Sequence, residues 1–139
     1  MTHEIYILDA CALIAFLNCE NGAQIVLNLL EKAENNEVKI LLHSINLCEI
    51  YYDCLRRNGK DKSDELLQII EKLPLEIVHT ISRELLIQTG RLKASEKISL
   101  ADAFVLALSI IEKGIVISSD HKEFDIIEKK GLTRFLWIR

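Results

Sequence analysis

"IYILDACALIAFL" spans residues 5–17 and joins two apolar runs through a single acid. Its first four residues, Ile5 to Leu8, are β-branched, aromatic or aliphatic, and this predicts a buried strand. A helix is expected to follow from Ala10 to Asn18. Asp9 lies between the two elements, where an unpartnered carboxylate is costly to bury. Asp9 therefore either caps the helix or serves a chemical purpose.

The same alternation of strand and helix continues along the chain. Apolar runs predict further strands at 38–43, 76–81, 115–118 and, at the edge of the sheet, 134–138. Helices are expected at 21–36, 44–58, 62–73, 82–97, 99–114 and 122–131. Ser44 is the expected N-cap of the second of these and Gly59 its stop, whereas Gly90 weakens the pattern of 82–97. Apolar strands without polar alternation indicate an α/β fold, with a mostly parallel sheet between two helical layers.

Composition limits the class of protein. A chain of 139 residues suits one domain, and its half-hydrophobic composition with one proline excludes disorder. The apolar runs 10–17 and 103–111 are too short to cross a bilayer and no targeting segment is evident, so we expect a cytoplasmic protein without a membrane. Four cysteines without CxxC or zinc-finger spacing are expected to be reduced core thiols: Cys11, Cys19, Cys48 and Cys54.

The net charge of −4 excludes a protein that holds nucleic acid through its phosphates alone. It does not exclude a nucleic-acid enzyme, because bound cations would reverse the field around a cluster of acids. If four of the 21 acidic residues bind cations, 17 acidic residues remain, which equals the number of basic residues.

Three further acids occupy positions like that of Asp9. Glu49 lies on the helix after the second strand, Asp102 opens the helix 99–114, and Asp120 follows the strand 115–118. Each has an ordinary explanation as a solvated face, a capping box or an N-cap. In a doubly wound sheet, however, ligands bind beyond the carboxyl ends of the strands, where all four acids would meet. Carboxylates at this density raise one another's pKa and suit Mg²⁺ or Mn²⁺.

Four blocks of the sequence resemble the PIN-domain ribonucleases, and in particular the VapC toxins of toxin–antitoxin pairs. The blocks are "YILDACALIAFL" (6–17), "SINLCEIYY" (44–52), "KISLADAFVLALS" (97–109) and "VISSDHKEFD" (116–125), and they match in order and spacing. The resemblance implies that residues 1–139 form a single PIN-like domain with a three-layer α/β/α fold. It also implies an Mg²⁺- or Mn²⁺-dependent endoribonuclease, a cognate antitoxin and a homodimer.

The resemblance assigns catalysis and metal binding to the same acids, namely Asp9, Glu49, Asp102 and Asp120. Asn46 and Ser118 match polar positions that support the ligands. Two cations would activate a water and stabilise the leaving 3′-oxygen, with Asp9 as the bridging ligand, and the products would carry 5′-phosphate and 3′-hydroxyl ends. Cys11 departs from the family, which commonly has Ser or Thr there.

Several residues keep two interpretations. Arg56, Arg57 and Lys93 would contact RNA phosphates or are ordinary surface charges. His121 is a general base or a solvated loop residue, and Asp125 matches an acid found only in some members. The helices 44–58 and 62–73, with Tyr51 and Tyr52, form either a groove for an antitoxin helix or part of the core.

The alternative function is a catalytically inactive PIN-like module that binds RNA or protein. Other enzyme classes fit less well. A phosphatase would have a second aspartate where Cys11 stands, a receiver domain would have an acidic pair, and a dinucleotide-binding enzyme would have a glycine-rich turn after its first strand.

Overall fold

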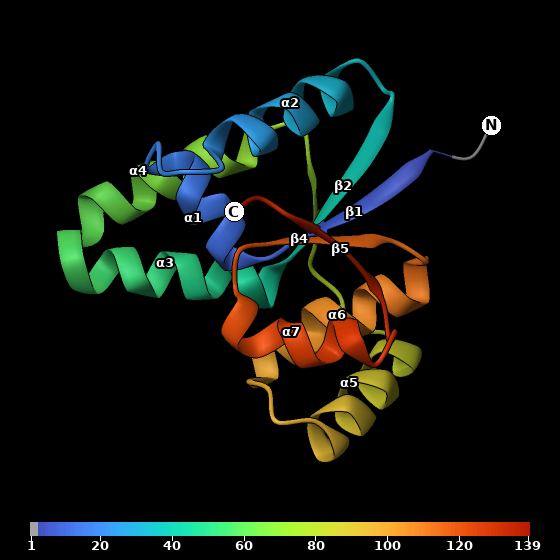
Figure 1. The fold of residues 1–139 in the computed structure, drawn as a ribbon. Helices are drawn as coiled ribbons and strands as arrows, with labels where there is room; N and C mark the ends of the chain where they lie inside the picture. The colour runs from blue at the N-terminus through green and yellow to red at the C-terminus, as the bar shows by residue number, and fades with distance from the viewer. Residues whose placement is uncertain (1–2) are drawn as a thin grey trace.

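Within residues 3–139, which the computed structural model describes, five strands form one sheet (Figure 1). They are β1 (Glu4–Leu8), β2 (Val38–His43), β3 (Glu76–Val78), β4 (Ile115–Ser118) and β5 (Arg134–Trp137). Their order is β3-β2-β1-β4-β5, and each neighbouring pair is parallel. The mostly parallel sheet expected from the sequence is confirmed, with every pairing in the parallel direction.

Helices cover both faces of this sheet. In the described part of the chain they are α1 (Ala10–Leu17), α2 (Ala23–Glu34), α3 (Ser44–Asn58), α4 (Lys60–Glu71), α5 (Arg83–Ser95), α6 (Leu100–Glu112) and α7 (His121–Lys129). The helices α1 to α4 lie on one side of the strands and α5 to α7 on the other (Figure 1). None of the helices within residues 3–139 combines the length and apolar character needed to cross a membrane.

Alternate residues of each strand supply the two hydrophobic cores. Ile7 and Val116 pack in the core under α5, α6 and α7, whereas their neighbours Leu8 and Ile117 pack in the core under α1 to α4. Because successive strand side chains point to opposite faces, a strand that is apolar throughout serves both cores at once. This is the physical reason for the three-layer α/β/α architecture, which is confirmed.

The strand order reverses between β1 and β4. From β1 the sheet grows through β2 to β3, and on the other side it grows through β4 to β5. The chain leaves β1 at Asp9, whose backbone N–H donates to the Ile117 carbonyl at 3.2 Å. In open parallel sheets this topological switch point is where ligands bind. Asp9 and the loop after β4 therefore flank the position that the fold favours for a site.

Local expectations needed correction at three places. The N-cap of α3 is His43, not Ser44, because the His43 ring accepts the Ile45 N–H at 3.1 Å. The strand expected at 76–81 ends at Val78. The helix α5 runs without interruption through Gly90 and begins after Ser82, whose hydroxyl accepts the Leu85 N–H at 3.1 Å.

The cysteines are free, as expected, but the expectation that they lie in the core is wrong. Cys11, Cys19 and Cys48 are exposed and Cys54 is partly buried. The buried faces of α1 and α3 are filled by other residues, among them Leu13 and Ile50, and none of the cysteines belongs to either hydrophobic core of the described residues.

Candidate active site

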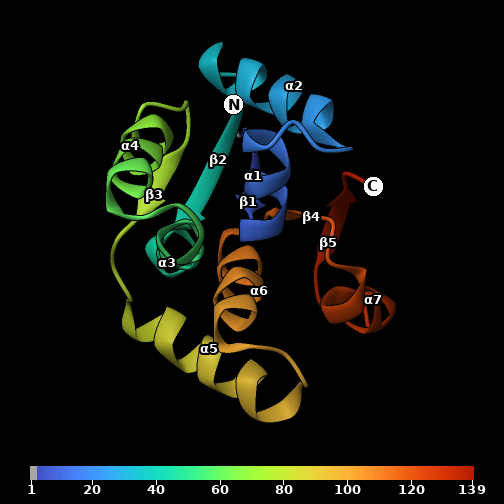
Figure 2. The same ribbon diagram turned by 90° about the vertical axis from the view of Figure 1, so that its left-hand side faces the viewer.

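The four acids predicted from the sequence lie where helices begin at the carboxyl edge of the sheet. Asp9 is the N-cap of α1, Asp120 is the N-cap of α7, and Asp102 lies in the first turn of α6. Glu49 lies one turn further along, in the helix α3 that follows β2. Figure 2 shows α1 and α6 at the centre of this side of the molecule, with α3 and α7 on either side of them. These acids are called the acidic cluster below.

Asp9 is fixed by hydrogen bonds to both of its carboxylate oxygens. Its Oδ1 accepts the Ala12 N–H at 2.8 Å, and its Oδ2 accepts the Ser118 hydroxyl at 2.5 Å. The same hydroxyl accepts the Asp120 N–H at 2.9 Å. Ser118, fully buried at the end of β4, therefore connects the two acids at the switch point. Each Asp9 oxygen keeps a second lone pair for another partner.

The acidic cluster is electrostatically coupled. Burial raises the pKa of Asp9 to about 7; the charges of Asp102 and Asp120 act in the same direction, and the hydrogen bonds from Ser118 and Ala12 oppose it. Burial also raises the pKa of Asp102 to about 7, against a hydrogen bond from Ser99 and with the charges of Asp120, Glu123 and Glu49. The side chains affect one another because they share a partly desolvated edge.

Glu49 and Asn46 form the α3 side of the site. Burial raises the pKa of Glu49, and the neighbouring Asn46 amide opposes this effect. Asn46 is 1% exposed, and its Nδ2 donates to the Ala101 carbonyl at 3.3 Å, next to Asp102. Its Oδ1 is buried without a hydrogen-bond partner. Asn46 thus lies beside Glu49 and bonds the residue that precedes Asp102.

Glu123 is a further acid beside the cluster that no pattern in the sequence singled out. This residue lies in the first turn of α7; its N–H donates to the Asp120 carboxylate at 3.2 Å, and its charge raises the pKa of Asp102. One of its carboxylate oxygens, Oε2, is buried without a partner. Residues 120–123 have the Asp-x-x-Glu spacing of a capping box, but the Asp120 N–H that such a glutamate would accept is bonded to Ser118 instead.

The donor set of this edge fits a hard divalent cation. Carboxylate and amide oxygens are the ligands that Mg²⁺ and Mn²⁺ prefer, and thiol or imidazole ligands for a softer metal do not dominate here. A buried acceptor without a donor is costly, and Asn46 Oδ1 and Glu123 Oε2 both have this character. As the side chains of residues 3–139 stand, no three His, Cys, Asp or Glu residues enclose a metal position. The donor atoms of these residues are of the type that a divalent cation binds. The side chains would have to rotate before three of them could contact one cation.

Cys11 borders the acidic cluster. Although Cys11 is exposed as a whole, its thiol is partly desolvated beside the acids. This desolvation raises the pKa of the thiol to about 12, and the charges of Asp9, Asp120, Asp102 and Glu49 add to the effect. The thiol is therefore neutral at physiological pH and adds no charge to the site.

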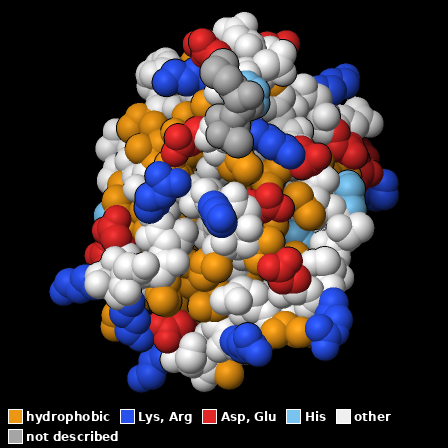
Figure 3. Space-filling model, turned by 90° about the vertical axis from the view of Figure 1, so that its right-hand side faces the viewer, with side chains coloured by type: hydrophobic (Ala, Val, Ile, Leu, Met, Phe, Trp, Pro, Cys, Tyr) orange, Lys and Arg blue, Asp and Glu red, His pale blue; other side chains and the backbone are white. Residues whose placement is uncertain are grey.

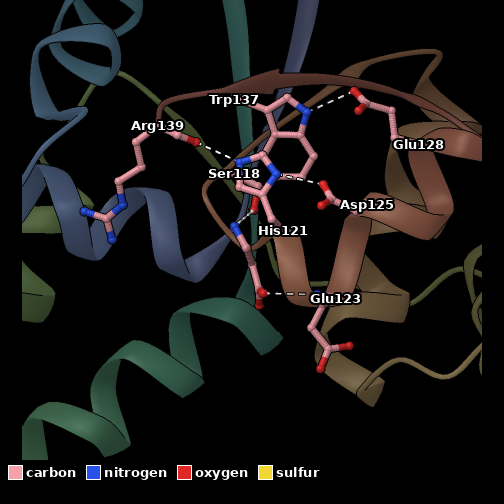
Figure 4. Close-up of polar contacts among 8 residues, drawn as sticks. Ser118, His121, Glu123, Asp125, Glu128, Trp137 and Arg139 are labelled. Carbon is pink, nitrogen blue, oxygen red and sulfur yellow. Dashed lines mark hydrogen bonds and ion pairs between the residues drawn. The ribbon is translucent and has the colours of Figure 1, made fainter.

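His121 and Asp125 do not join the acidic cluster but contact each other. The His121 Nδ1 donates to Asp125 at 2.7 Å, and its Nε2 donates to the backbone oxygen of Arg139 at 2.8 Å (Figure 4). Both hydrogen bonds raise the pKa of His121, and the bond to Arg139 has the larger effect. Because neither nitrogen is free to accept a proton, the arrangement does not favour a general base.

The three cations considered for RNA contacts are exposed and lie outside the cluster. Arg56 and Arg57 are in the last turn of α3, about 10 Å along the helix from Glu49 by helical rise. Arg56 lies over the Tyr52 ring at 5.0 Å, and Arg57 pairs with Asp53 at 3.3 Å. Lys93 is in the last turn of α5.

A hollow lies at the opposite edge of the sheet. Its volume is about 420 Å³, and its lining includes Glu4, Glu112 and Arg134. Arg134 pairs there with Glu4 at 3.5 Å. Figure 3 shows a face on which basic and acidic side chains alternate without a patch of one sign. This hollow has neither the converging acids nor the buried unpartnered acceptors of the acidic cluster.

The fold and the site together define a three-layer α/β/α protein with an acidic site at the switch point of a parallel sheet. The model of the PIN domain family matches residues 6–130. The chain therefore belongs to the PIN-domain family. No curated protein sequence matches it.

Solved structures share this fold over nearly the whole chain. VapBC2 from Rickettsia felis, bound to a promoter DNA fragment, is 22% identical with a TM-score of 0.74, covering 96% of this chain and 98% of that one. DNA-bound VapBC from Salmonella typhimurium is 15% identical with a TM-score of 0.73, covering 99% and 100%. VapC20 from Mycobacterium tuberculosis, a toxin that cleaves the sarcin–ricin loop, is 14% identical with a TM-score of 0.61, covering 80% and 86%.

Proposed function

We propose that this protein is an Mg²⁺- or Mn²⁺-dependent endoribonuclease and the toxin of a toxin–antitoxin pair. The observation that carries the proposal is the acidic cluster, in which Asp9 and Asp102 each have a pKa raised to about 7 by burial and by neighbouring acids. Carboxylates are placed at such a cost where cations neutralise them. Family membership and the fold shared with VapC20 support RNA as the substrate.

Asp9, Glu49, Asp102 and Asp120 would hold the cations, and Glu123 is a fifth candidate because its buried Oε2 lacks a partner. Divalent cations supply an activated water and charge stabilisation for the leaving oxygen in phosphodiester hydrolysis. Ser118 would keep Asp9 oriented, and Asn46 Oδ1 would accept a hydrogen bond from a water at the site. A bridging Asp9 is compatible with the remaining lone pair on each of its oxygens.

The RNA would lie across the carboxyl edge of the sheet. Of the two arginines on α3, Arg56 is the better candidate for a contact with an RNA phosphate, because Arg57 already pairs with Asp53. Lys93 lies on α5, in the other helical layer, and its contact with RNA is the weakest part of this proposal.

An antitoxin is the proposed partner. Between α1, α3 and α4 lies a hollow of about 280 Å³ with a mixed lining. Apolar side chains line one part of it (Ile14, Leu17, Ile50 and Leu66), and polar ones border them (Asn18, Asp53, Arg57 and Asn58). Leu55 and Ile69 are exposed apolar residues on α3 and α4. Such a surface suits the apolar face of a partner helix. The VapBC complexes with the same fold support this partner class.

We also propose a single PIN-like domain, a homodimer and a cytoplasmic location. All strands from β1 to β5 share one sheet, which supports a single domain. Exposed apolar side chains at Ile81, Leu86 and Leu100, on and beside α5 and α6, support self-association. The absence of a membrane-crossing helix among residues 3–139 is compatible with the proposed location.

Cleavage of a mixed pool of cellular RNA by the purified protein tests the nuclease. We expect discrete fragments with Mn²⁺, none with EDTA, and none with Asp102→Asn. The matched control is Asp61→Asn, which makes the same change at an exposed position in the first turn of α4 and should cut like the unmodified protein.

The second candidate function is an inactive PIN-like binding module. It is favoured by the open arrangement of the acids, since no three donors among the described residues enclose a metal as they stand. A folded preparation, free of any partner, that neither cuts RNA nor binds Mn²⁺ by calorimetry would overturn the nuclease and favour this module.

A further inference from the structure

Three aromatic rings form a stack beside the acidic cluster. The Phe135 and Trp137 rings of β5 lie 5.1 Å apart between centroids and 9° from parallel. The His121 ring lies on Trp137, with centroids 3.8 Å apart and planes 18° from parallel (Figure 4). Phe135 also contacts Phe124, which is fully buried, at 5.2 Å. This aromatic stack is therefore anchored in the core, with His121 as its outer ring.

The His121 ring is held on both edges. Its Nδ1 bonds Asp125 at 2.7 Å and its Nε2 bonds the Arg139 backbone oxygen at 2.8 Å. The position of Trp137 is fixed in turn by its indole N–H, which donates to Glu128 at 2.9 Å. The His121 side chain is 46% exposed. Because one face of the ring lies on Trp137 and both nitrogens have partners, the other face is the part left for a ligand. A flat aromatic surface is thus presented in a fixed orientation.

The position of this surface points to its occupant. His121 directly follows Asp120, an acid of the cluster, so the stacked ring and that acid are both held at the start of α7. Proteins recognise single-stranded RNA by stacking unpaired bases on aromatic rings, and a ring held in place loses little freedom on binding. Both ring nitrogens already have hydrogen-bond partners, so the outer face of the ring, and not its edge, is what remains for a ligand.

We propose that the outer face of His121 is a stacking site for an unpaired RNA base next to the scissile phosphate. The inference rests on the proposed function and assigns the contact with the base to one named side chain, His121. The hydrogen bonds of His121 to Asp125 and Arg139 orient the stacking ring and take no part in proton transfer.

The test measures binding in EDTA, so that cleavage does not interfere. Fluorescence anisotropy would follow a labelled rA10 decamer and a labelled abasic decamer with the same ribose–phosphate backbone. For His121→Ala we expect rA10 affinity to fall about 5- to 150-fold, the range for one stacked base, and abasic affinity to stay within about twofold. His121→Phe should recover most of the loss because it keeps an aromatic face.

His79→Ala is the matched control, because His79 is an exposed histidine in the segment after β3, and it should bind rA10 like the unmodified protein. Trp137 is the chain's only tryptophan, so its emission should change on rA10 binding and change less in His121→Ala. Circular dichroism would confirm that each variant is folded, and His121→Tyr would replace His121→Phe if the latter is not.

Unchanged rA10 binding by folded His121→Ala, or an equal loss for the abasic decamer, would overturn the stacking site. The nuclease proposal fails separately: a protein that binds rA10 through His121 but cuts no RNA with Mn²⁺ would keep the stacking site and lose the proposed activity. Conversely, Mn²⁺-dependent cutting together with His121-independent binding would remove only the stacking site.

Discussion

Ser118 connects two acids of the site through its hydroxyl group. It is fully buried at the end of β4, donates to Asp9 and accepts from the Asp120 backbone. A hydroxyl is one of the few groups that can do both at once. Removing it would leave Asp9 with one hydrogen bond and free the loop that carries Asp120. Ser118 thus orients two acids from strands that are neighbours only in the folded sheet.

Ser118→Ala should weaken Mn²⁺ binding by about 10- to 100-fold, the usual cost of losing a group that orients a metal ligand. Calorimetric titration of Mn²⁺ would measure it. Ser109→Ala is the control, because the Ser109 hydroxyl is also buried but bonds the Leu106 carbonyl and Thr133, away from the acids. Equal Mn²⁺ affinity in Ser118→Ala and the unmodified protein would contradict the role given to Ser118.

Which residues the sequence could reveal depended on how local their contacts are. Asp9, Asp102 and Asp120 follow strands or open helices, so chain order alone placed them at the carboxyl edge. Glu123 was missed because its role depends on Asp102, in another helix. The ring bond of His121 to Arg139 joins residues 18 apart, and no pattern in the sequence indicates it.

At the scale of elements, helices and strands were predictable by period and their ends were not. The helix α5 shows how packing overrides a local sequence signal. Gly90 weakens a helical pattern by propensity, yet packing of Leu85 and Leu92 on the core holds the helix together. The N-cap of α3 was misplaced because the sequence favours a serine hydroxyl, whereas the folded chain uses the His43 ring, which Thr80 orients from beyond β3.

Gly90→Ala should stabilise the protein by about 1 kcal/mol, because alanine is the better helix former and a Cβ at this position meets no atom within 4 Å. Thermal unfolding would show a rise of a few degrees. Gly59→Ala is the contrasting control, since Gly59 has a φ of +85° that strains any L side chain, and it should lower the melting temperature. A lower melting temperature for Gly90→Ala would contradict the packing described for α5.

His43 should make the start of α3 sensitive to acid. Burial lowers the pKa of His43 relative to its ordinary value near 6.5, with the charge of His79 acting in the same direction and the bond to Thr80 opposing both. The unfolded chain therefore takes up a proton first. The stability that neutral His43 provides is present above about pH 6.5 and is lost as the pH falls below it.

His43→Asn should flatten this dependence, because asparagine caps a helix without titrating. In EDTA, protonation of Asp9 and Asp102 stabilises both proteins as the pH falls from 7 to 5, whereas protonation of His43 opposes this gain only in the unmodified protein. The urea midpoint should therefore rise more from pH 7 to pH 5 for His43→Asn than for the unmodified protein. His79→Asn, an exposed histidine changed in the same way, should keep most of the unmodified slope. Equal slopes for His43→Asn and the unmodified protein would contradict this account of the cap.

For the whole molecule, the acidic cluster links stability, pH and metal. Without a cation, the folded protein favours protonated Asp9 and Asp102, whose pKa values are both raised to about 7. In the unfolded chain these carboxyls ionise near pH 4. Their contribution to stability is therefore fully present below about pH 4 and is lost as the pH rises through 7. For Asp9, which is 2% exposed, this amounts to about 4 kcal/mol.

The metal-free protein should accordingly melt at a lower temperature at pH 8 than at pH 5, and Mn²⁺ should recover the loss at pH 8 by binding only the folded state. Asp9→Asn should be more stable than the unmodified protein at pH 8 in EDTA, because it removes the buried charge, and should gain little from Mn²⁺. Asp61→Asn should follow the unmodified protein throughout. Thermal unfolding at both pH values, with EDTA or Mn²⁺, measures all three.

If Asp9→Asn in EDTA keeps the unmodified dependence on pH, the buried charge of Asp9 is not its cause. If Asp9→Asn gains as much stability from Mn²⁺ as the unmodified protein, Asp9 is not a ligand, and the cation would have to be held by the acids of α3, α6 and α7 alone.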